Sequence, residues 1–322
     1  MSSRFQNKIS RRTMIVGTLA LGAVDRLGLA SAAAYAADES SLPVVYHAKD
    51  VTPQNMVRLY DLLRADAGAP RPGRFGIKLH GDEVSLNRPL WEALREHVPG
   101  SVYVEGNWAS AYESSSRGNT DGNREAIIRQ GVRPEHIDIL DRDKRYRNVP
   151  IAGGRLLKEV SVSSALLDEY GTVAVAANWK IPSFAGFSGA VKNVGIGLAG
   201  AYGKTAVHGD GFRKDAAFFE RLAEAAKGIS EAMPGRLLYL NVLTNVQAAP
   251  LEGADVHSGT SGILASLDMT AADQAAVDLL YGLTPAQYDA YPEAVKIERG
   301  FLQLEYLQQL GFGSRRYRLV EI

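Results

Sequence analysis

The sequence predicts an α/β fold in which helices flank a largely parallel sheet, arranged as one continuous unit or as two lobes. Apolar runs rich in small or β-branched residues alternate along the chain with longer segments of helical periodicity. Such alternation is typical of parallel sheets, because a helix returns the chain to the edge where the next strand begins. The apolar share of 46% and the charged share of 22% are those of an ordinary globular protein.

The first half of the predicted sheet alternates regularly between the two kinds of element. A helix at about 53–66 precedes the apolar run 75–79, which predicts a strand. A helix at 90–97 then precedes a second strand at 102–105. A helical pattern at 123–130 follows this strand, so the chain is expected to cross from strand to strand through helices.

The second half repeats the alternation with longer elements. Small and β-branched residues at 172–177 predict a buried strand, and residues 215–232 form a long amphipathic pattern typical of a helix. The remaining predicted elements are strands at 237–242 and 263–267, helices at 271–281 and 298–310, and a closing strand at 317–320.

Polar residues follow several of these strands directly. Ligands of open α/β sheets collect beyond the carboxyl ends of the strands, so these residues are candidates for a binding site. Trp108 and Trp179 follow strand ends too and are candidates to wall a pocket. The candidate ligand-binding residues at these ends are Lys78, His80, Asn107 and Lys180, and His80 is also a candidate acid–base group.

The stretch 183–210 is the most unusual part of the chain, with six glycines between positions 186 and 203. Glycines let a backbone approach a ligand closely, and nearby lysines favour an anionic group, although close packing is an alternative reason for glycine. Gly195, Gly197 and Gly200 match the spacing G-x-G-x-x-G. The stretch is nevertheless neither a phosphate-loop signature nor a clean dinucleotide fingerprint. The candidate site residues here are Gly189, Lys192, Asn193, Gly195, Gly197, Lys204 and His208.

Lys204 and His208 lie four residues apart, so one helix face would carry both. Histidine can bind a metal, move a proton or serve only as a structural hydrogen-bonding group. His208, Lys192 and His80 are therefore the candidate catalytic residues, and His208 is the candidate metal ligand. The mixed charges of 141–147 predict a solvated face instead of a site.

Residues 1–36 predict an export signal. A basic segment without acids precedes a short apolar run and a small-residue cleavage site. The pair Arg11-Arg12 resembles a twin-arginine signal, which implies the twin-arginine export machinery as a partner and a periplasmic or extracellular location. An ordinary secretory signal is the alternative. The apolar run is shorter than the ~20 residues of a membrane span, so we expect none in the mature chain.

Charge and cysteine content exclude several classes of function. The full sequence has 36 basic and 36 acidic residues, but residues 1–36 carry five basic groups and one acid. The mature chain is therefore near −4, and nucleic acid is not an expected partner. The absence of cysteine excludes disulfides, thiolate nucleophiles and cysteine-held metal clusters.

Several motifs resemble the domain-of-unknown-function 362 family, in order over residues 43–321. The resemblance implies the α/β fold and no established reaction. Many members insert a four-cysteine segment after the position of His208, which this chain lacks, so an iron–sulfur cluster is not expected. The matching segments are 77–81 with 87–89, Asn107 with Tyr112 and 116–117, 187–197 with 203–204 and His208, 262–268 with 273–275 and Asp278, and 304–306 with 310–311 and 316–317.

A looser likeness concerns Gly189-Ala190-x-Lys192 with His208 sixteen residues later, which is similar to a pattern of the lactate racemase family. In that family the lysine anchors a nickel-bearing pyridinium cofactor and the histidine helps to hold the metal. The likeness implies Lys192 as an anchor and His208 as a nickel ligand.

The sequence therefore predicts an exported small-molecule enzyme with a Lys/His pocket for an anionic ligand. A non-catalytic ligand- or metal-binding protein derived from iron–sulfur relatives is the alternative, and a racemase-like cofactor enzyme is a further one. Convergence of Lys192, Lys204 and His208 in one cleft would favour the enzyme. Substrate, cofactor and oligomeric state are not predicted.

Overall fold

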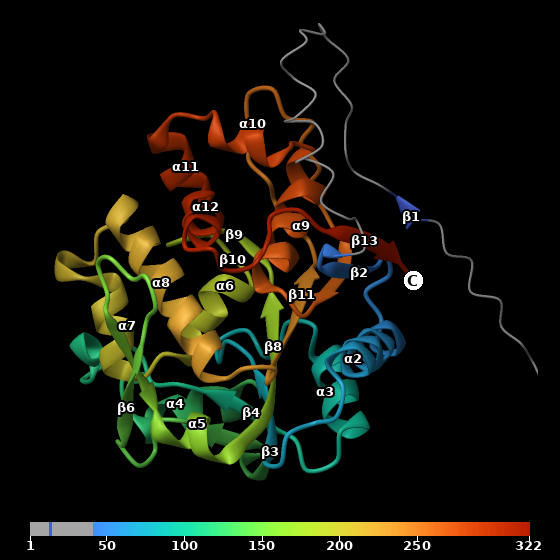
Figure 1. Ribbon diagram of the computed structural model, residues 1–322. Helices are drawn as coiled ribbons and strands as arrows, with labels where there is room; N and C mark the ends of the chain where they lie inside the picture. The colour runs from blue at the N-terminus through green and yellow to red at the C-terminus, as the bar shows by residue number, and fades with distance from the viewer. Residues whose placement is uncertain (1–12, 15–40) are drawn as a thin grey trace, which may run out of the picture.

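The computed structural model describes residues 13–14 and 41–322, and most of the predicted signal at 1–36 lies outside them. The main sheet consists of β1 (Thr13–Met14), β2 (Val44–Ala48), β3 (Arg74–Lys78), β4 (Val102–Glu105), β5 (Ile137–Ile139), β8 (Tyr170–Asn178), β11 (Leu237–Leu243), β12 (Gly262–Ser266) and β13 (Arg318–Glu321). Their spatial order is β1-β13-β2-β12-β11-β8-β3-β4-β5 (Figure 1). The pairs from β11 through β5 are parallel, whereas β12 is antiparallel to both of its neighbours. The predicted α/β fold with a largely parallel sheet is confirmed.

Two hairpins and a set of helices complete the chain. The hairpins pair β6 (Tyr146–Pro150) with β7 (Glu159–Ser163) and β9 (Lys180–Ser183) with β10 (Gly186–Ser188). The α-helices are α2 (Pro53–Ala67), α3 (Arg88–His97), α4 (Thr120–Arg129), α5 (Ser164–Glu169), α6 (Ala190–Lys192), α7 (Ala201–His208), α8 (Ala216–Ala232), α9 (Met269–Tyr281), α10 (Pro285–Asp289), α11 (Glu293–Arg299) and α12 (Leu302–Gln309). One π-helix, η4 (Asn193–Leu198), follows α6, and the 3₁₀ turns are η2 (Ser110–Tyr112), η3 (Pro134–His136) and η5 (Asp210–Phe212).

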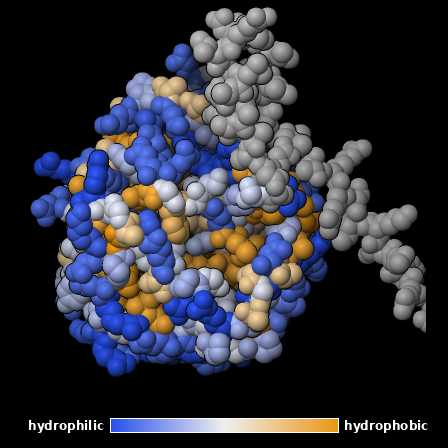
Figure 2. Space-filling model, viewed as in Figure 1, coloured by the Kyte–Doolittle hydropathy of each residue, from blue (hydrophilic) through white to orange (hydrophobic). Residues whose placement is uncertain are grey.

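Helices cover both faces of the sheet (Figure 1). Because strand side chains alternate between faces, Val173 and Val175 of β8 pack with α8 and α9, whereas Ala174 and Ala176 pack with α2 and α3. The main core thus has two layers, one on each side of the sheet. On the face seen in Figure 2, apolar side chains gather in patches within a largely hydrophilic surface.

Side chains cap the N-termini of the three longest helices, α2, α8 and α9. Thr52 accepts a hydrogen bond from Asn55 N at the start of α2, and Asp215 accepts one from Phe218 N at the start of α8. Asp268 accepts from the backbone of Thr270 and Ala271 at the start of α9. These caps satisfy backbone donors that have no partner within the helix.

The predicted helix at 298–310 is two helices, so this prediction was wrong. Gly300 ends α11 with φ of +83°, a left-handed conformation that glycine adopts without strain. A Cβ at this position would also lie 2.1 Å from the carbonyl oxygen of Ala185. The chain therefore bends at Gly300 and continues as α12.

Candidate functional site

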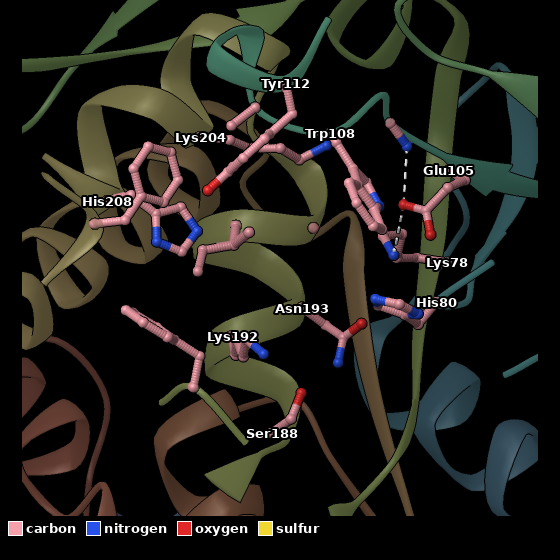
Figure 3. Close-up of a pocket in the computed structure, with 16 residues that line it drawn as sticks. Lys78, His80, Glu105, Trp108, Tyr112, Ser188, Lys192, Asn193, Lys204 and His208 are labelled. Carbon is pink, nitrogen blue, oxygen red and sulfur yellow. Dashed lines mark hydrogen bonds and ion pairs between the residues drawn. The ribbon is translucent and has the colours of Figure 1, made fainter. Parts of the chain in front are cut away.

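A cavity of about 610 Å³ lies beyond the carboxyl ends of β3 and β4, the location that the parallel sheet predicts. Strand ends and the loop after β4 form one side, and α6, η4 and α7 form the other (Figure 3). The cavity brings together Lys192, Lys204 and His208, as the enzyme hypothesis requires. The predicted residues that line it are Lys78, His80, Lys192, Asn193, Gly197, Lys204 and His208.

The strand side of the cavity carries opposite charges in contact. Lys78 Nζ lies 3.1 Å from Glu105 Oε1 and donates a 2.9 Å hydrogen bond to the carbonyl oxygen of Leu79. Glu105 also accepts hydrogen bonds from the backbone of Gly81 and Gly106. Both side chains are buried, so Lys78 depends on Glu105 for compensation, and Glu105 also lies 3.6 Å from Arg117 Nη2.

A second buried lysine stands beside this pair. Lys204 Nζ donates a 2.5 Å hydrogen bond to the carbonyl oxygen of Asn107, whose N–H donates to Asp141 Oδ2. Asp141 also accepts from Ala201 N, at the start of α7, and so joins the helix to the strand loop. We call Lys78, Glu105, Lys204 and Asp141 the paired wall.

The paired wall shifts the protonation of its members. Burial alone would raise the pKa of Glu105, but the nearby basic groups of Lys78, His80, Lys204 and Arg117 lower it to about 2. Burial lowers the pKa of Lys78 and of Lys204, while the neighbouring carboxylates oppose this shift. Glu105 is therefore ionised at neutral pH and neutralises the strand side of the cavity.

Two glycines leave room for the lysines. A Cβ at Gly106 would lie 2.5 Å from Lys204 Nζ, and a Cβ at Gly197 would lie 2.8 Å from Lys78 Cε. Contacts this short would force the buried lysines to move. Gly197, near the end of η4, thus leaves room for Lys78 of β3 and also lines the cavity.

The helical side of the cavity differs from the strand side because Lys192 has no ion-pair partner among the described residues. Lys192 ends α6 and lines the cavity, and no hydrogen bond or ion pair joins its Nζ to another described residue. Burial, together with the cations Lys180 and Lys78, lowers the pKa of Lys192 to about 8. A larger fraction of this amine is therefore neutral near physiological pH than for an exposed lysine.

A buried carboxylate from α9 fixes the segment that carries Lys192. Asp273 accepts hydrogen bonds of 2.7 Å from Ala190 N and 2.9 Å from Val191 N, and Asn241 donates a third. Asp273 is fully buried. These bonds tie the start of α6, which continues directly into η4, to α9 and β11.

His208 ends α7 within an aromatic cluster. Its ring stacks on Phe212 and Phe218, at centroid distances of 4.6 and 5.5 Å, and meets the edge of Phe184 at 5.3 Å. Burial, with the cations Lys192 and Arg221, lowers the pKa of His208 to about 4, so the imidazole is neutral at pH 7. Its Nδ1 is buried without a hydrogen-bond partner in the described structure. We call Lys192 and His208 the open wall.

Aromatic side chains surround the cavity. Trp108, Tyr112 and Phe184 line it and remain 38–45% exposed, which few large apolar side chains of the described residues do. The guanidinium of Arg117 lies 5.5 Å from the Trp108 ring centroid. Exposed apolar rings around a cavity that also holds charged groups are typical of a ligand site, since a folded chain otherwise buries them.

Four predicted ligand-binding residues lie outside the lining. Asn107 is buried, and its backbone carbonyl oxygen accepts a hydrogen bond from Lys204 Nζ. Lys180 forms an ion pair with Glu83. A Cβ at Gly189 would meet Asp273, and one at Gly195 would meet the backbone of Leu222 on α8, so both glycines allow close packing. Trp179 is also buried, stacked on Phe187, whereas Trp108 walls the cavity.

Sequence reasoning missed the acidic half of the paired wall. Glu105 ends β4, but Asn107 is the residue that the sequence suggested there. The solvated face expected at 141–147 was wrong for Asp141, which is buried because its carboxylate accepts two backbone N–H groups. The sequence did contain one usable signal. Lys78 ends the apolar run of β3 and Glu105 ends that of β4, and the ends of parallel strands meet at one edge of the sheet.

Two features are absent from the described residues, a cluster of metal-binding side chains and a membrane-spanning helix. No three histidine, aspartate or glutamate side chains of residues 41–322 group closely enough to hold a metal ion. None of the described helices combines the length and apolar character needed to cross a membrane.

Comparison with known families decides the affiliation of the chain. The model of the family described as "Domain of unknown function (DUF362)" matches residues 84–278. The chain belongs to this family. The resemblance seen in the sequence is thereby confirmed. The matched DUF362 region contains Glu105, Lys192, Lys204 and His208, whereas Lys78 and His80 precede it.

No curated protein matches the DUF362 chain significantly. Two solved structures resemble this chain at low sequence identity and low TM-score. The lactate racemase apoprotein from Thermoanaerobacterium thermosaccharolyticum has 13% identity and a TM-score of 0.38, covering 64% of this chain and 51% of its own. A structural-genomics protein from Thermotoga maritima has 16% identity and a TM-score of 0.36, covering 62% and 52%. The chain thus spans about half the length of each, and likeness at this level says nothing about its reaction.

Proposed function

We propose that this protein is an enzyme that acts on a small anionic molecule with an apolar part, held in the cavity between the paired and open walls. Lys192 would attract the anionic group, and the rim of Trp108, Tyr112 and Phe184 would cover the apolar part. His208, neutral and in the same cavity, would accept or donate a proton.

One observation carries the proposal: Lys192 is a cavity lysine without a counterion among the described residues. Lys78 and Lys204 are already compensated by Glu105 and Asp141, so an added anion gains little from them. A cation that has given up part of its hydration without gaining a partner favours an anion that enters beside it. The largely apolar lining of the cavity strengthens this attraction, because it lowers the local dielectric constant.

Thermal-shift measurements with a panel of small carboxylates and phosphate esters test the binding part. We expect at least one carboxylate with an apolar tail to raise the melting temperature of the wild type. Lys192→Met should abolish this shift, whereas Lys49→Met, at an exposed lysine paired with Glu321, should retain it. Equal shifts in both variants would contradict the proposal.

The catalytic part separates this proposal from the non-catalytic alternative. An enzyme should convert a bound compound, and His208→Phe, which keeps an aromatic ring in the stack, should abolish conversion while binding remains. Binding without conversion of any bound compound would support a binding protein. An intact mass above that of the bare chain, absent from Lys192→Met, would instead support an anchored cofactor.

Export remains part of the proposal. It is supported by the basic segment that contains Arg11-Arg12 and by the apolar run after it. We expect the full chain to reach the periplasm of a host with the twin-arginine machinery, and Arg11→Lys/Arg12→Lys to stay in the cytoplasm. Export that persists in a strain without this machinery would indicate an ordinary secretory signal.

A further inference from the structure

We propose that Lys192 is an imine-forming lysine, whose Nζ condenses with the carbonyl carbon of a small 2-oxo acid. The inference rests on the proposed function and adds a substrate class to it. It starts from the difference between Lys192 and the two other lysines of the cavity.

Lys78 and Lys204 are unsuited to attack a carbonyl. Burial lowers the pKa of both lysines, but each Nζ already donates a hydrogen bond to a backbone oxygen and stands beside a buried carboxylate. An amine engaged in this way is not free to approach a carbonyl carbon, so neither lysine is placed to act as a nucleophile.

Lys192 meets the requirements that the other two fail. Its Nζ has no partner in the described structure, it borders the cavity, and the nearest titratable neighbours, Lys180, Lys78 and His208, include no acid. Cationic neighbours and partial removal from water favour the neutral amine over the ammonium form. The amine is thus both free to react and accessible to a compound in the cavity.

The bond changes balance without any redox partner. The Nζ lone pair attacks the carbonyl carbon and gives a carbinolamine, and loss of the carbonyl oxygen as water leaves a C=N bond. The amine gives up two hydrogens, which leave in the water. His208 faces the same cavity as a neutral imidazole, so it can take a proton from nitrogen and return it to the departing oxygen (Figure 3).

The surroundings suit a carbonyl compound that is also a carboxylate. The protonated imine keeps a positive charge at the position of Lys192, so a carboxylate on the adjacent carbon retains a counterion. Trp108, Tyr112 and Phe184 around the cavity would cover the carbon chain of the 2-oxo acid. The paired wall stays neutral throughout, because Lys78 and Glu105 remain joined.

Reductive trapping tests the inference on the purified full chain. Pyruvate or 2-oxobutyrate is added with sodium cyanoborohydride, and the modified lysines are located by peptide mass spectrometry. We expect one stable adduct per chain, at Lys192, with about tenfold or more labelling over exposed Lys49 at pH 7.5. Absence of an adduct with both compounds, or labelling spread evenly over exposed lysines, would overturn the inference.

Lys192→Arg separates the inference from the proposed function. Arginine retains the positive charge but not the nucleophilic amine, so this variant should lose the adduct and keep the thermal shift given by butyrate. Lys49→Arg, the matched control, should keep both. A wild type that binds butyrate but traps no oxo acid would refute only the imine, whereas a wild type that traps no oxo acid and binds no carboxylate of the panel would refute both proposals.

Discussion

Both walls of the cavity contain lysine, but its charge is compensated by carboxylates in one wall and uncompensated in the other. In the paired wall, Lys78 lies 3.1 Å from Glu105, and both are buried. In the open wall, Lys192 has no partner among the described residues, and His208 is held by aromatic stacking with its Nδ1 unsatisfied. The difference indicates that the paired wall provides a fixed, neutral background and that the open wall is available for chemistry.

The largest expected effect concerns the paired wall. Glu105→Gln leaves Lys78 buried without a counterion and should lower the free energy of unfolding by about 3–5 kcal/mol. Glu92→Gln, at an exposed glutamate paired with Arg88, should cost less than about 1 kcal/mol. Denaturant unfolding measures both, and equal small losses would contradict the distinction between the walls.

The same residue predicts a pH dependence. The pKa of Glu105 is lowered to about 2 in the folded chain, against about 4.3 when unfolded. Its stabilising contribution is therefore complete above pH 4.3 and is lost as the pH falls towards 2. The wild type and Glu105→Gln should converge in stability over this range.

The next largest effect is expected for Gly197→Ala, which tests whether the missing side chain of Gly197 makes room for Lys78 of the paired wall. Helix propensity alone predicts that Gly197→Ala stabilises the chain by up to about 1 kcal/mol. The added Cβ would instead lie 2.8 Å from Lys78 Cε, and overpacking of this kind costs about 1–3 kcal/mol. A net loss of stability in denaturant unfolding is expected, and a gain would show that Lys78 moves freely.

Lys192→Met should act in the opposite direction. The folded pKa of about 8 lies below the unfolded value of about 10.4, so the folded chain disfavours the charged lysine at neutral pH. Its removal should leave stability unchanged or raise it by up to about 1 kcal/mol at pH 7. The gain should shrink as the pH rises from 8 to 10.4, where both states lose the charge. Unfolding curves at pH 7 and 10 measure it, and a loss at pH 7 would reveal a partner for Lys192.

The smallest effect concerns the rim. Trp108→Ala removes a half-exposed ring stacked near Arg117 and should cost about 0.5–1 kcal/mol in the free energy of unfolding. Because the ring lines the cavity, affinity for a carboxylate with an apolar tail should fall more than affinity for acetate. Leu86→Ala, at another exposed apolar residue, should change neither affinity. Equal loss for both ligands would remove Trp108 from the site.

The sequence predicted the sheet and much of the cavity, for physical reasons. Strand–helix alternation is a local pattern, and parallel strand ends must meet at one edge, which placed Lys78 and His80 correctly at the cavity. Lys192, Lys204 and His208 followed from glycine content and helical spacing.

What the sequence left open depends on contacts between distant segments. Asp141 appeared to belong to a surface run of mixed charge, since nothing local shows that the backbone of Asn107 and Ala201 encloses its carboxylate. Gly189 and Gly195 carried the same local signal as Gly197, yet their missing side chains face Asp273 and α8. Only the packed structure separates a glycine that borders the cavity from one that lets two segments pack closely.

The bond between Asp273 and α6 has a consequence for the order of assembly. The carboxylate that holds Ala190 and Val191 is encoded 82–83 residues later, and Asn241 joins the same contact from β11. During synthesis, a chain that has emerged only as far as α8 contains Lys192 but not Asp273, whose carboxylate holds α6 in place. Closing such a long loop is a late, entropically costly step. We therefore expect the ligand to protect nascent chains from proteolysis only after α9 has left the ribosome.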